Sequence, residues 1–531
     1  MKSSLSLFSL SLFVFLFSSL GASKALAQAD FDMSKPPYFC SQELGKLPVQ
    51  QGGRVKPIEV HAREVVKYLT GKTSAEGYSA TVLYCLLSLE GLDLSAGFKL
   101  NHKIEHVKVR ELLGDKEVSI IPYDDLVAKA EVLRIERQRL TVDDGYKKAV
   151  TKALNQAMLY QEIKIGQNWT LPLMNGPDVA WIPLTSFLTE ERVLKQNPNT
   201  SAPNPFHGAL FEAKSLYEQF HGTKHNIEFI FASIGFPSVG LIICLLALAA
   251  LTLFKRFTLA LVLSALTVLL QTVYFVFRIY ISERAPVTNM YETVVFSGYS
   301  ALILAMFLGH FKKEKVYLYM GLGYNVMCLM MTNFAHGMLS PGISPLVPVL
   351  RDNFWLSTHV TVVIMSYGAY ALSWILANTV LFKKRFGTLT SRDELYYSDI
   401  IYTCIKWGSV LIAAGIILGG VWADYSWGRF WGWDPKETWS LIVFCLYIAI
   451  LHGRYTNWIP THRFVVFSAA AFMSVMMCWF GVNYILASGL HSYGFSEGGA
   501  LFLGSFFLIQ TVFIIMTIPF MKSDSSKTQT A

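Results

Sequence analysis

Apolar residues are distributed unevenly along the chain, and their pattern divides it into two parts. Residues 30–226 mix apolar and polar positions as soluble proteins do, whereas from about residue 227 long apolar runs alternate with short polar stretches. A membrane-spanning helix needs about 20 apolar residues. The pattern therefore predicts an all-α polytopic membrane protein of about nine transmembrane helices, preceded by a soluble mixed α/β or mostly α region. The nine predicted spans are residues 233–254, 258–280, 291–310, 316–334, 357–382, 399–421, 438–452, 464–486 and 499–520.

The soluble region offers a few local signals of its own. A Gly-Gly pair at residues 52–53 predicts a turn before an amphipathic helix over residues 58–69. Apolar positions at helical spacing predict a second helix over 145–165, and residues rich in Asn and Pro predict a loop over 195–208.

The first 27 residues resemble a secretory signal peptide. Lys2 is a short positive segment, Leu5 begins an apolar run, and small residues follow at positions 25 and 27. An uncleaved anchor helix is the alternative interpretation. Both interpretations place residues 28–226, the predicted N-terminal domain, outside the cytoplasm.

The short loops between the apolar runs carry an orienting charge pattern. With the N-terminal domain outside, nine crossings make residues 227–521 the membrane domain and 522–531 a cytoplasmic tail. Thirteen basic residues then fall in inner segments, against four in outer loops: Arg284, Arg351, Arg429 and Lys436. Positive residues concentrate on the cytoplasmic side of membrane proteins. The asymmetry therefore supports this orientation independently of the N-terminus.

Composition and charge narrow the class of protein further. Hydrophobic residues make up 53% of the chain and charged residues 15%, below the roughly 25% of soluble domains. The net charge of +8 follows from the inner loops, and no basic patch interleaved with aromatics indicates nucleic acid as a partner. Of the seven cysteines, five lie in apolar runs. Only Cys40 and Cys85 could pair in an oxidising compartment, and the sequence leaves open whether they do.

The most unusual stretch is residues 422–440, WADYSWGRFWGWDPKETWS, which contains five tryptophans. The predicted topology places it outside, between the sixth and seventh spans. One interpretation is a membrane-interface belt, where tryptophan is enriched. Five tryptophans among glycines exceed what a belt needs, however, and suit a flat apolar ligand, because aromatic faces bury a large area at little entropic cost.

Three histidines lie where they could ligate such a ligand. His359 at the outer end of the fifth span and His491 just beyond the eighth share the face of the tryptophan-rich stretch. Two histidines flanking an aromatic surface match the needs of a bis-histidine heme site; interfacial histidines bonded to backbone or lipid are the alternative. His452, near the inner end of the seventh span, is either a helix-end residue favoured by the helix dipole or an axial ligand within the bundle. His336 in an outer loop remains a further candidate, and the remaining histidines show no ligand-like pairing.

These residues carry a resemblance to a known family. WGRFWGWDPKETWSLI, residues 427–442, resembles the WWD domain of heme-handling proteins in the form found in the CcsA (ResC) family of System II cytochrome c biogenesis. LPVQQGGRVKP, residues 47–57, resembles the extramembrane stretch that precedes the CcsA part in longer members. The resemblance covers about residues 230–520, with thinner support at 46–70.

The resemblance implies a ligand, a site and partners. The ligand is heme b as a bound substrate. The family's external axial ligands correspond to His359 and His491, and its transmembrane histidine, a transient ligand, corresponds to His452. The core of the WWD motif corresponds to Trp427, Trp431, Trp433 and Asp434. The implied partners are a separate CcsB (ResB)-like membrane subunit and apocytochromes c with a CxxCH motif, at the periplasmic side of a bacterial inner membrane.

Three functions stay open at this point. The first is a component of a cytochrome c synthase that attaches heme covalently to CxxCH apocytochromes. The second is a heme exporter or chaperone without the ligation step, and the third is an unrelated multi-pass transporter. Transporters usually show repeat symmetry and broken helices at the midplane, and no such pair of segments is evident. Co-expression with a CxxCH acceptor separates the first two.

Overall fold

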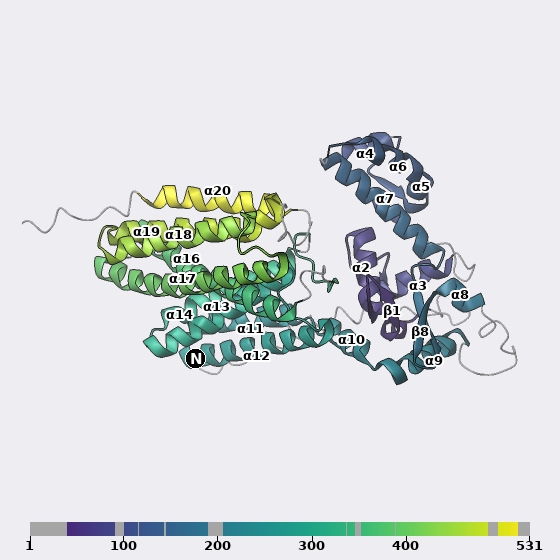
Figure 1. The fold of residues 1–531 in the computed structure, drawn as a ribbon, viewed down its shortest axis with the longest axis horizontal. Coiled ribbons are helices and arrows are strands. Elements are labelled where there is room, and N and C mark those ends of the chain that lie inside the picture. Colours follow the sequence, from purple (N-terminus) through teal and green to yellow (C-terminus); the bar gives the residue numbers. More distant parts are fainter. Residues whose placement is uncertain are drawn as a thin grey trace, which may run out of the picture. The chain divides into compact units, whose positions relative to one another are not determined.

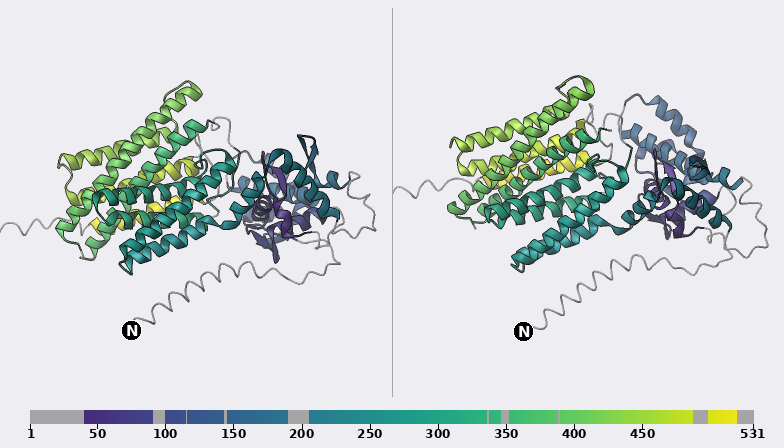
Figure 2. Two further views of the ribbon diagram at one scale, coloured as in Figure 1. Left: turned by 90° about the horizontal axis from the view of Figure 1, so that it is seen from below. Right: turned by 60° about the horizontal axis from the view of Figure 1, so that its bottom comes forward.

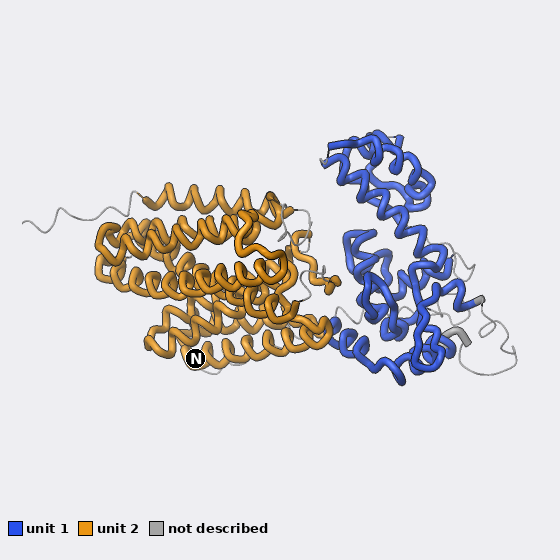
Figure 3. The backbone as a smooth tube through the Cα atoms, in the orientation of Figure 1, with its two compact units in different colours: residues 1–233 blue, residues 234–531 orange. Residues whose placement is uncertain are grey.

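The computed structural model describes most of the chain. The described residues are 40–90, 100–114, 116–142, 145–189, 205–335, 337–345, 352–387, 389–486 and 498–518. The predicted signal segment, the C-terminal tail, His336 and His491 lie outside these ranges. Contacts divide the chain into two compact units, Met1–Ser233 and Ile234–Ala531, which Figure 3 colours separately.

The first unit combines helices with four two-stranded antiparallel sheets, as the fold prediction allowed. Its elements in chain order are η2 (Gln42–Lys46), β1 (Pro48–Gln51), β2 (Arg54–Pro57), α2 (Ile58–Thr70), β3 (Ser74–Ala75), β4 (Tyr78–Ser79), α3 (Ala80–Glu90), β5 (Asn101–Lys103), α4 (Val107–Leu112), β6 (Ile120–Pro122), α5 (Tyr123–Ala128), α6 (Ala130–Arg139), α7 (Gly145–Lys164), β7 (Thr170–Asn175), β8 (Asp178–Pro183), α8 (Leu184–Thr189), α9 (Pro205–His221) and α10 (Lys224–Ile234). Each sheet pairs strands that are neighbours in sequence, so the sheets need no crossover connection.

Local sequence decides the start of this unit as predicted. Gly52 and Gly53 both adopt positive φ, 62° and 79°, which turns β1 back onto β2 at little steric cost. Helix α2 follows, and it buries one face, including Val65, Val66 and Leu69. Helix α7 confirms the second predicted helix. The loop predicted to reach residue 208 is shorter, because α9 already begins at Pro205, a residue suited to the first helical turn.

A disulfide between Cys40 and Cys85 settles the pairing that the sequence left open. The two Cα atoms are 5.6 Å apart, and the bond ties the chain before η2 to α3. Both cysteines are buried in the hydrophobic core of this unit. Disulfides persist in oxidising compartments, so the bond agrees with a location outside the cytoplasm.

Removing this disulfide is expected to destabilise the first unit by about 2–5 kcal/mol, because the unfolded chain gains conformational freedom. Cys85→Ser in the full-length protein should show this as faster limited proteolysis within residues 40–189. Reductant should reproduce the effect in the wild type. Cys445→Ser, at an exposed membrane-helix position without a disulfide, is the matched control. Equal proteolysis rates in both variants would contradict the stabilising role.

The second unit is a helical bundle (Figures 1 and 2). Its elements are α11 (Phe236–Thr252), α12 (Phe257–Ser282), α13 (Met290–Lys312), α14 (Val316–Phe334), α15 (Asn353–Trp355), η4 (Leu356–Val360), α16 (Thr361–Arg385), α17 (Ser391–Trp427), α18 (Pro435–Tyr455), α19 (Thr461–Met476), η5 (Met477–Leu486) and α20 (Gly499–Thr517). Among the described residues, eight helical segments are long and apolar enough to cross a membrane. The prediction of a polytopic membrane protein is confirmed.

Helix α14 corresponds to the remaining predicted span. Its tyrosines and asparagines make it less apolar than the other eight, but it packs against α11 and α13. Asn325 of α14 and Gln271 of α12 exchange two side-chain hydrogen bonds of 3.1 Å, so each amide is satisfied inside the bundle. This pairing explains how a polar residue fits there, because lipid offers no hydrogen-bonding partner.

Helix α16 lies at the centre of the bundle and contacts α13, α14, α17, α19 and α20. Its spanning segment is the most buried of the eight. Helix α17 is longer than predicted: its 37 residues extend about 55 Å, well beyond the roughly 30 Å hydrocarbon core.

The tryptophan-rich stretch is therefore mostly helical. Residues 422–427 complete α17, Gly428 ends it with a φ of 66°, and α18 begins at Pro435, within the stretch as predicted. Only residues 428–434 connect the helices. The connection is shorter than the expected 422–440, because a C-terminal glycine and an Asp-Pro start signal set its two limits.

Candidate functional site

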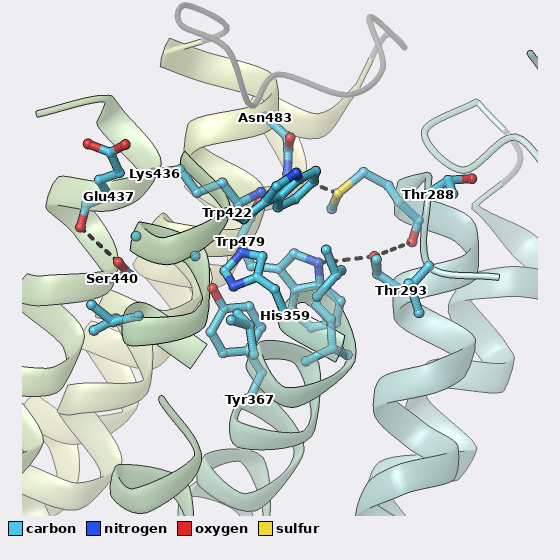
Figure 4. A pocket seen from close by; sticks show the side chains of 18 of the residues that line it. Thr288, Thr293, His359, Tyr367, Trp422, Lys436, Glu437, Ser440, Trp479 and Asn483 are labelled. Carbon is cyan, nitrogen blue, oxygen red and sulfur yellow. Dashed lines mark hydrogen bonds between the residues drawn. The ribbon is translucent and has the colours of Figure 1, made fainter. Parts of the chain in front are cut away.

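A cavity opens at the end of the bundle where the 428–434 connection lies (Figure 4). The space between its walls, open solvent included, is about 910 Å³. Five parts of the chain line it: the start of α13, η4 with α16, the end of α17, the connection with the start of α18, and η5. The lining is largely apolar, with a few polar groups among aromatic rings, as in small-molecule sites.

His359 is one of the polar groups in this cavity. It lies in η4, a π-helical segment, a type of widened turn often found at functional sites. Asp352 starts the helix by accepting hydrogen bonds from the backbone N–H groups of residues 354 and 355. The imidazole Nδ1 lies 2.8 Å from the carbonyl oxygen of Gly415 on α17. A carbonyl accepts only, so Nδ1 carries the proton and Nε2 holds the lone pair that binds a metal.

Small residues on α17 allow this close approach. A Cβ at Gly419 would lie 2.6 Å from Cε1 of His359, and one at Gly415 would lie 2.6 Å from Cγ2 of Val363. The ring of Phe430 packs equally closely against Gly420. Three glycines in the last third of α17 therefore set how closely η4 and the connection approach the helix.

The tryptophans of the predicted motif do not act alike. Trp431 lines the cavity, and its ring meets that of Trp433 edge-on at 5.8 Å. Trp433 itself is 70% exposed and has a φ of 58°, a conformation that bulky residues rarely adopt. Trp427 lies outside the cavity lining. The guanidinium carbon of Arg429 lies over its ring, 5.8 Å from the ring centroid. The sequence motif thus divides between the cavity and its rim.

Asp434 performs a structural task. Its carboxylate accepts from the backbone N–H of Lys436 at 2.9 Å, and Glu437 accepts from the N–H of Asp434 and of Gly432. This reciprocal capping box fixes the start of α18. The guanidinium of Arg429 forms an ion pair with the Glu437 carboxylate at 3.5 Å, between the 428–434 connection and the start of α18. The cationic residue that lines the cavity is Lys436.

Sequence reasoning missed several lining residues. Trp422 was counted among the five tryptophans, but only the structure brings it to 5.8 Å from the His359 ring. Trp479 and Asn483 come from η5, a second π-helical segment. Trp479 donates to Thr293 of α13, and Asn483 donates to the sulfur of Met290 at 3.1 Å. A buried asparagine in an otherwise apolar run was the available signal, because polar residues in spanning helices are seldom incidental.

A buried ion pair holds the α13 side of the cavity. Arg278 of α12 donates to Glu292 of α13 through Nε at 3.0 Å and also donates to the carbonyl of Pro341. The other carboxylate oxygen accepts from the backbone N–H and the hydroxyl of Thr288, both at 2.8 Å. Both charged side chains are at most 3% exposed. The pair thereby orders the segment before α13 that lines the cavity.

Of the other two predicted ligands, only His452 belongs to the described residues, and it is not part of the cavity lining. His491 lies outside the described residues, five positions beyond Leu486, the end of η5. His452 is exposed near the end of α18, about 25 Å along the helix from Pro435, and its carbonyl accepts from Thr456. His452 and His359 therefore lie towards opposite ends of the bundle, as the predicted topology also placed them.

Three histidines buried in the first unit have structural environments. His61 is hydrogen bonded through Nε2 to Oδ1 of Asn168 at 2.8 Å. Burial, together with nearby Lys56, lowers the pKa of His61 to about 4, so it stays neutral. Burial likewise lowers the pKa of His102 to about 4. His225 lies 3.1 Å from Glu218. Among the described residues, no group of three or more His, Cys, Asp or Glu side chains is placed to hold a metal ion.

Comparison with known proteins adds independent information. The model of a family described as cytochrome C assembly protein matches residues 227–491. NrfI of Wolinella succinogenes is 29% identical over 536 residues, which cover 89% of this chain and 57% of NrfI. The cytochrome c biogenesis protein CcsA of Prochlorococcus marinus strain MIT 9303 is 31% identical over 263 residues, 43% of this chain and 82% of CcsA. CcsA of Chlamydomonas reinhardtii is 34% identical over 221 residues, 40% of this chain and 62% of that protein. The chain thus spans just over half the length of NrfI.

Proposed function

Because this chain belongs to the family of cytochrome c assembly proteins that includes CcsA, we propose that its cavity binds heme b as a substrate and presents it to apocytochromes c. The lining of the cavity supports this, because it includes one histidine and five aromatic side chains, those of Tyr367, Trp422, Phe430, Trp431 and Trp479. The observation that carries the proposal is the Nδ1 contact of His359 with the Gly415 carbonyl. This contact selects the tautomer with Nε2 as ligand and fixes the orientation of the ring.

His491 is the proposed second axial ligand. The proposal rests on the family resemblance and on η5, whose Trp479 and Asn483 already line the cavity shortly before that position. His452 is the proposed transient ligand, and its exposed position on α18 leaves it available to a neighbouring subunit. We propose that this neighbouring subunit is a CcsB (ResB)-like membrane protein.

The proposed reaction joins heme to a Cys-x-x-Cys-His segment of an apocytochrome. Each cysteine S–H adds across one heme vinyl group: a carbon–sulfur bond forms, the hydrogen goes to the other vinyl carbon, and no electrons are exchanged. The histidine of the segment replaces one histidine of this protein on the iron. What the protein supplies is the positioning of the two reactants and control of the iron through its axial ligands.

The proposed location is the cytoplasmic membrane of a bacterium, with the cavity and the first unit on the periplasmic side. The Cys40–Cys85 disulfide supports this for the first unit. The excess of basic residues in the predicted inner loops supports it for the membrane unit.

The test is the visible absorption spectrum of the detergent-purified protein, co-expressed with a CcsB-like subunit and a CxxCH reporter. A low-spin heme spectrum that becomes high-spin in His491→Ala, together with covalent heme on the reporter, is expected. If the protein binds heme but the reporter carries no covalent heme, the result would support the exporter or chaperone function instead. A heme-free wild type under ample heme supply would refute the proposal.

Gly419→Ala is expected to disturb this site without touching the ligand. The added methyl group would come within 2.6 Å of the His359 ring, so the imidazole must move and the iron–nitrogen bond should weaken. We expect a partly high-spin spectrum and heme retention reduced several-fold, because a displacement of about 1 Å is costly in a preorganised site. Gly504→Ala, where a Cβ meets nothing within 4 Å, should match the wild type. Identical spectra for Gly419→Ala and wild type would exclude the steric role.

A further inference from the structure

The indole N–H of Trp422 is a buried donor that the protein itself leaves unsatisfied. Trp422 is 2% exposed and lines the cavity, and within the described part of the chain its Nε1 has no hydrogen-bond acceptor. Leaving a buried donor unpaired is costly, and such groups are rare in folded proteins. The donor therefore calls for an acceptor that enters the cavity from outside.

Other indoles of the bundle show the usual arrangement. Trp479, on the neighbouring wall, donates to the hydroxyl of Thr293 at 3.2 Å. Trp374 in α16 donates to the amide oxygen of Gln510 at 3.0 Å. Both of these indole N–H groups thus have a protein acceptor. Trp422 differs, and it differs at the cavity.

The surroundings of Trp422 indicate the chemistry of the acceptor. Its ring lies 5.8 Å from that of His359, and Lys436 lines the same cavity (Figure 4). The carboxylate of Glu437 also lines it, but it already accepts from the backbone N–H groups of residues 432 and 434. An N–H donor beside a cation favours a negatively charged oxygen, because charge-assisted hydrogen bonds are the stronger ones. A carboxylate held here would place the rest of its molecule among the aromatic rings and within reach of the histidine.

We propose that the Trp422 indole N–H is a ligand-binding group of this cavity and that it takes a carboxylate of the bound molecule. This inference rests on the proposed function, under which the carboxylate is one of the two propionates of heme. It assigns to Trp422 a role that the tryptophans of the 427–433 motif do not share. The ring of Trp422 packs within the protein, and its N–H donates a hydrogen bond to the carboxylate of the ligand.

The test compares heme with heme dimethyl ester, in which both acids are masked. Detergent-purified, heme-depleted protein is titrated with each, and the ratio of the two dissociation constants is measured. The wild type should prefer the acid by about tenfold or more, as expected for a hydrogen bond to a charged group. Trp422→Phe keeps an aromatic ring but removes the donor, so the ratio should fall towards one. Trp407→Phe, on the same helix but 40% exposed and outside the cavity lining, should keep the wild-type ratio.

A second variant guards against misfolding of Trp422→Phe. Replacing Trp422 by 3-benzothienylalanine keeps the bicyclic shape and removes only the N–H, so it should lose the same preference. An unchanged preference in this variant would overturn the inference and leave heme binding intact. A wild type that binds neither compound would instead overturn the proposed function. If added anionic phospholipid abolishes the wild-type preference, the acceptor is a lipid headgroup and the inference fails.

Discussion

Arg278→Met is expected to lower the free energy of unfolding of the membrane unit by about 3–5 kcal/mol, because it leaves the buried Glu292 carboxylate without its cation. The loss should extend to the cavity, since Glu292 also holds Thr288 on the cavity wall. Unfolding in denaturant, followed by tryptophan fluorescence of the detergent-solubilised protein, measures the effect.

The double variant Arg278→Met, Glu292→Gln separates charge from shape. Glutamine removes the negative charge but keeps an oxygen that can accept from Thr288, so most of the lost stability should return. Asp399→Asn is the matched control. Arg454 pairs with Asp399 at 3.4 Å, and the aspartate side chain is 76% exposed. Breaking such a pair should cost less than about 1 kcal/mol. Equal losses for Arg278→Met and Asp399→Asn would show that burial of the first pair contributes nothing.

His359→Gly is expected to reduce the heme retained on purification by more than about tenfold, because an axial ligand is lost from the iron. Glycine leaves a space of the size of the side chain, and added imidazole should enter it and restore both the heme content and the low-spin spectrum. The heme-to-protein ratio and the spectrum are measured with and without imidazole. Restoration would distinguish lost ligation from a general collapse of the cavity.

His310→Ala provides the comparison for this variant. His310 lies near the end of α13 away from the residues that line the cavity, beside Phe311. Heme content in His310→Ala should equal that of the wild type, with or without imidazole. Parallel loss in both variants, or a His359→Gly protein that imidazole does not restore, would contradict ligation by His359.

The tryptophan motif illustrates how far residue types alone can lead. Sequence predicted an aromatic surface on the outer side and a helix starting within it, and α18 does begin at Pro435. It treated Asp434 and three tryptophans as one site. In the structure Asp434 caps a helix, Trp433 is exposed, and Trp431 alone of the three lines the cavity. A motif records which residues occur together, whereas the direction of each side chain depends on where the helices end and how the connection folds.

Hydropathy by itself determined the membrane fold, because a backbone in lipid must satisfy its hydrogen bonds within helices. The charge pattern predicted an orientation in the membrane. The hydropathy pattern placed His359 at the end of the fifth predicted span. Only the tertiary structure decided which side chains line the cavity. Trp422 and Trp479 are far apart in sequence, yet both line the cavity with His359, whose ring lies close to α17 because Gly419 leaves room for it. Such contacts depend on the packing of whole helices around α16, and packing is a property of their combined shapes rather than of any one segment.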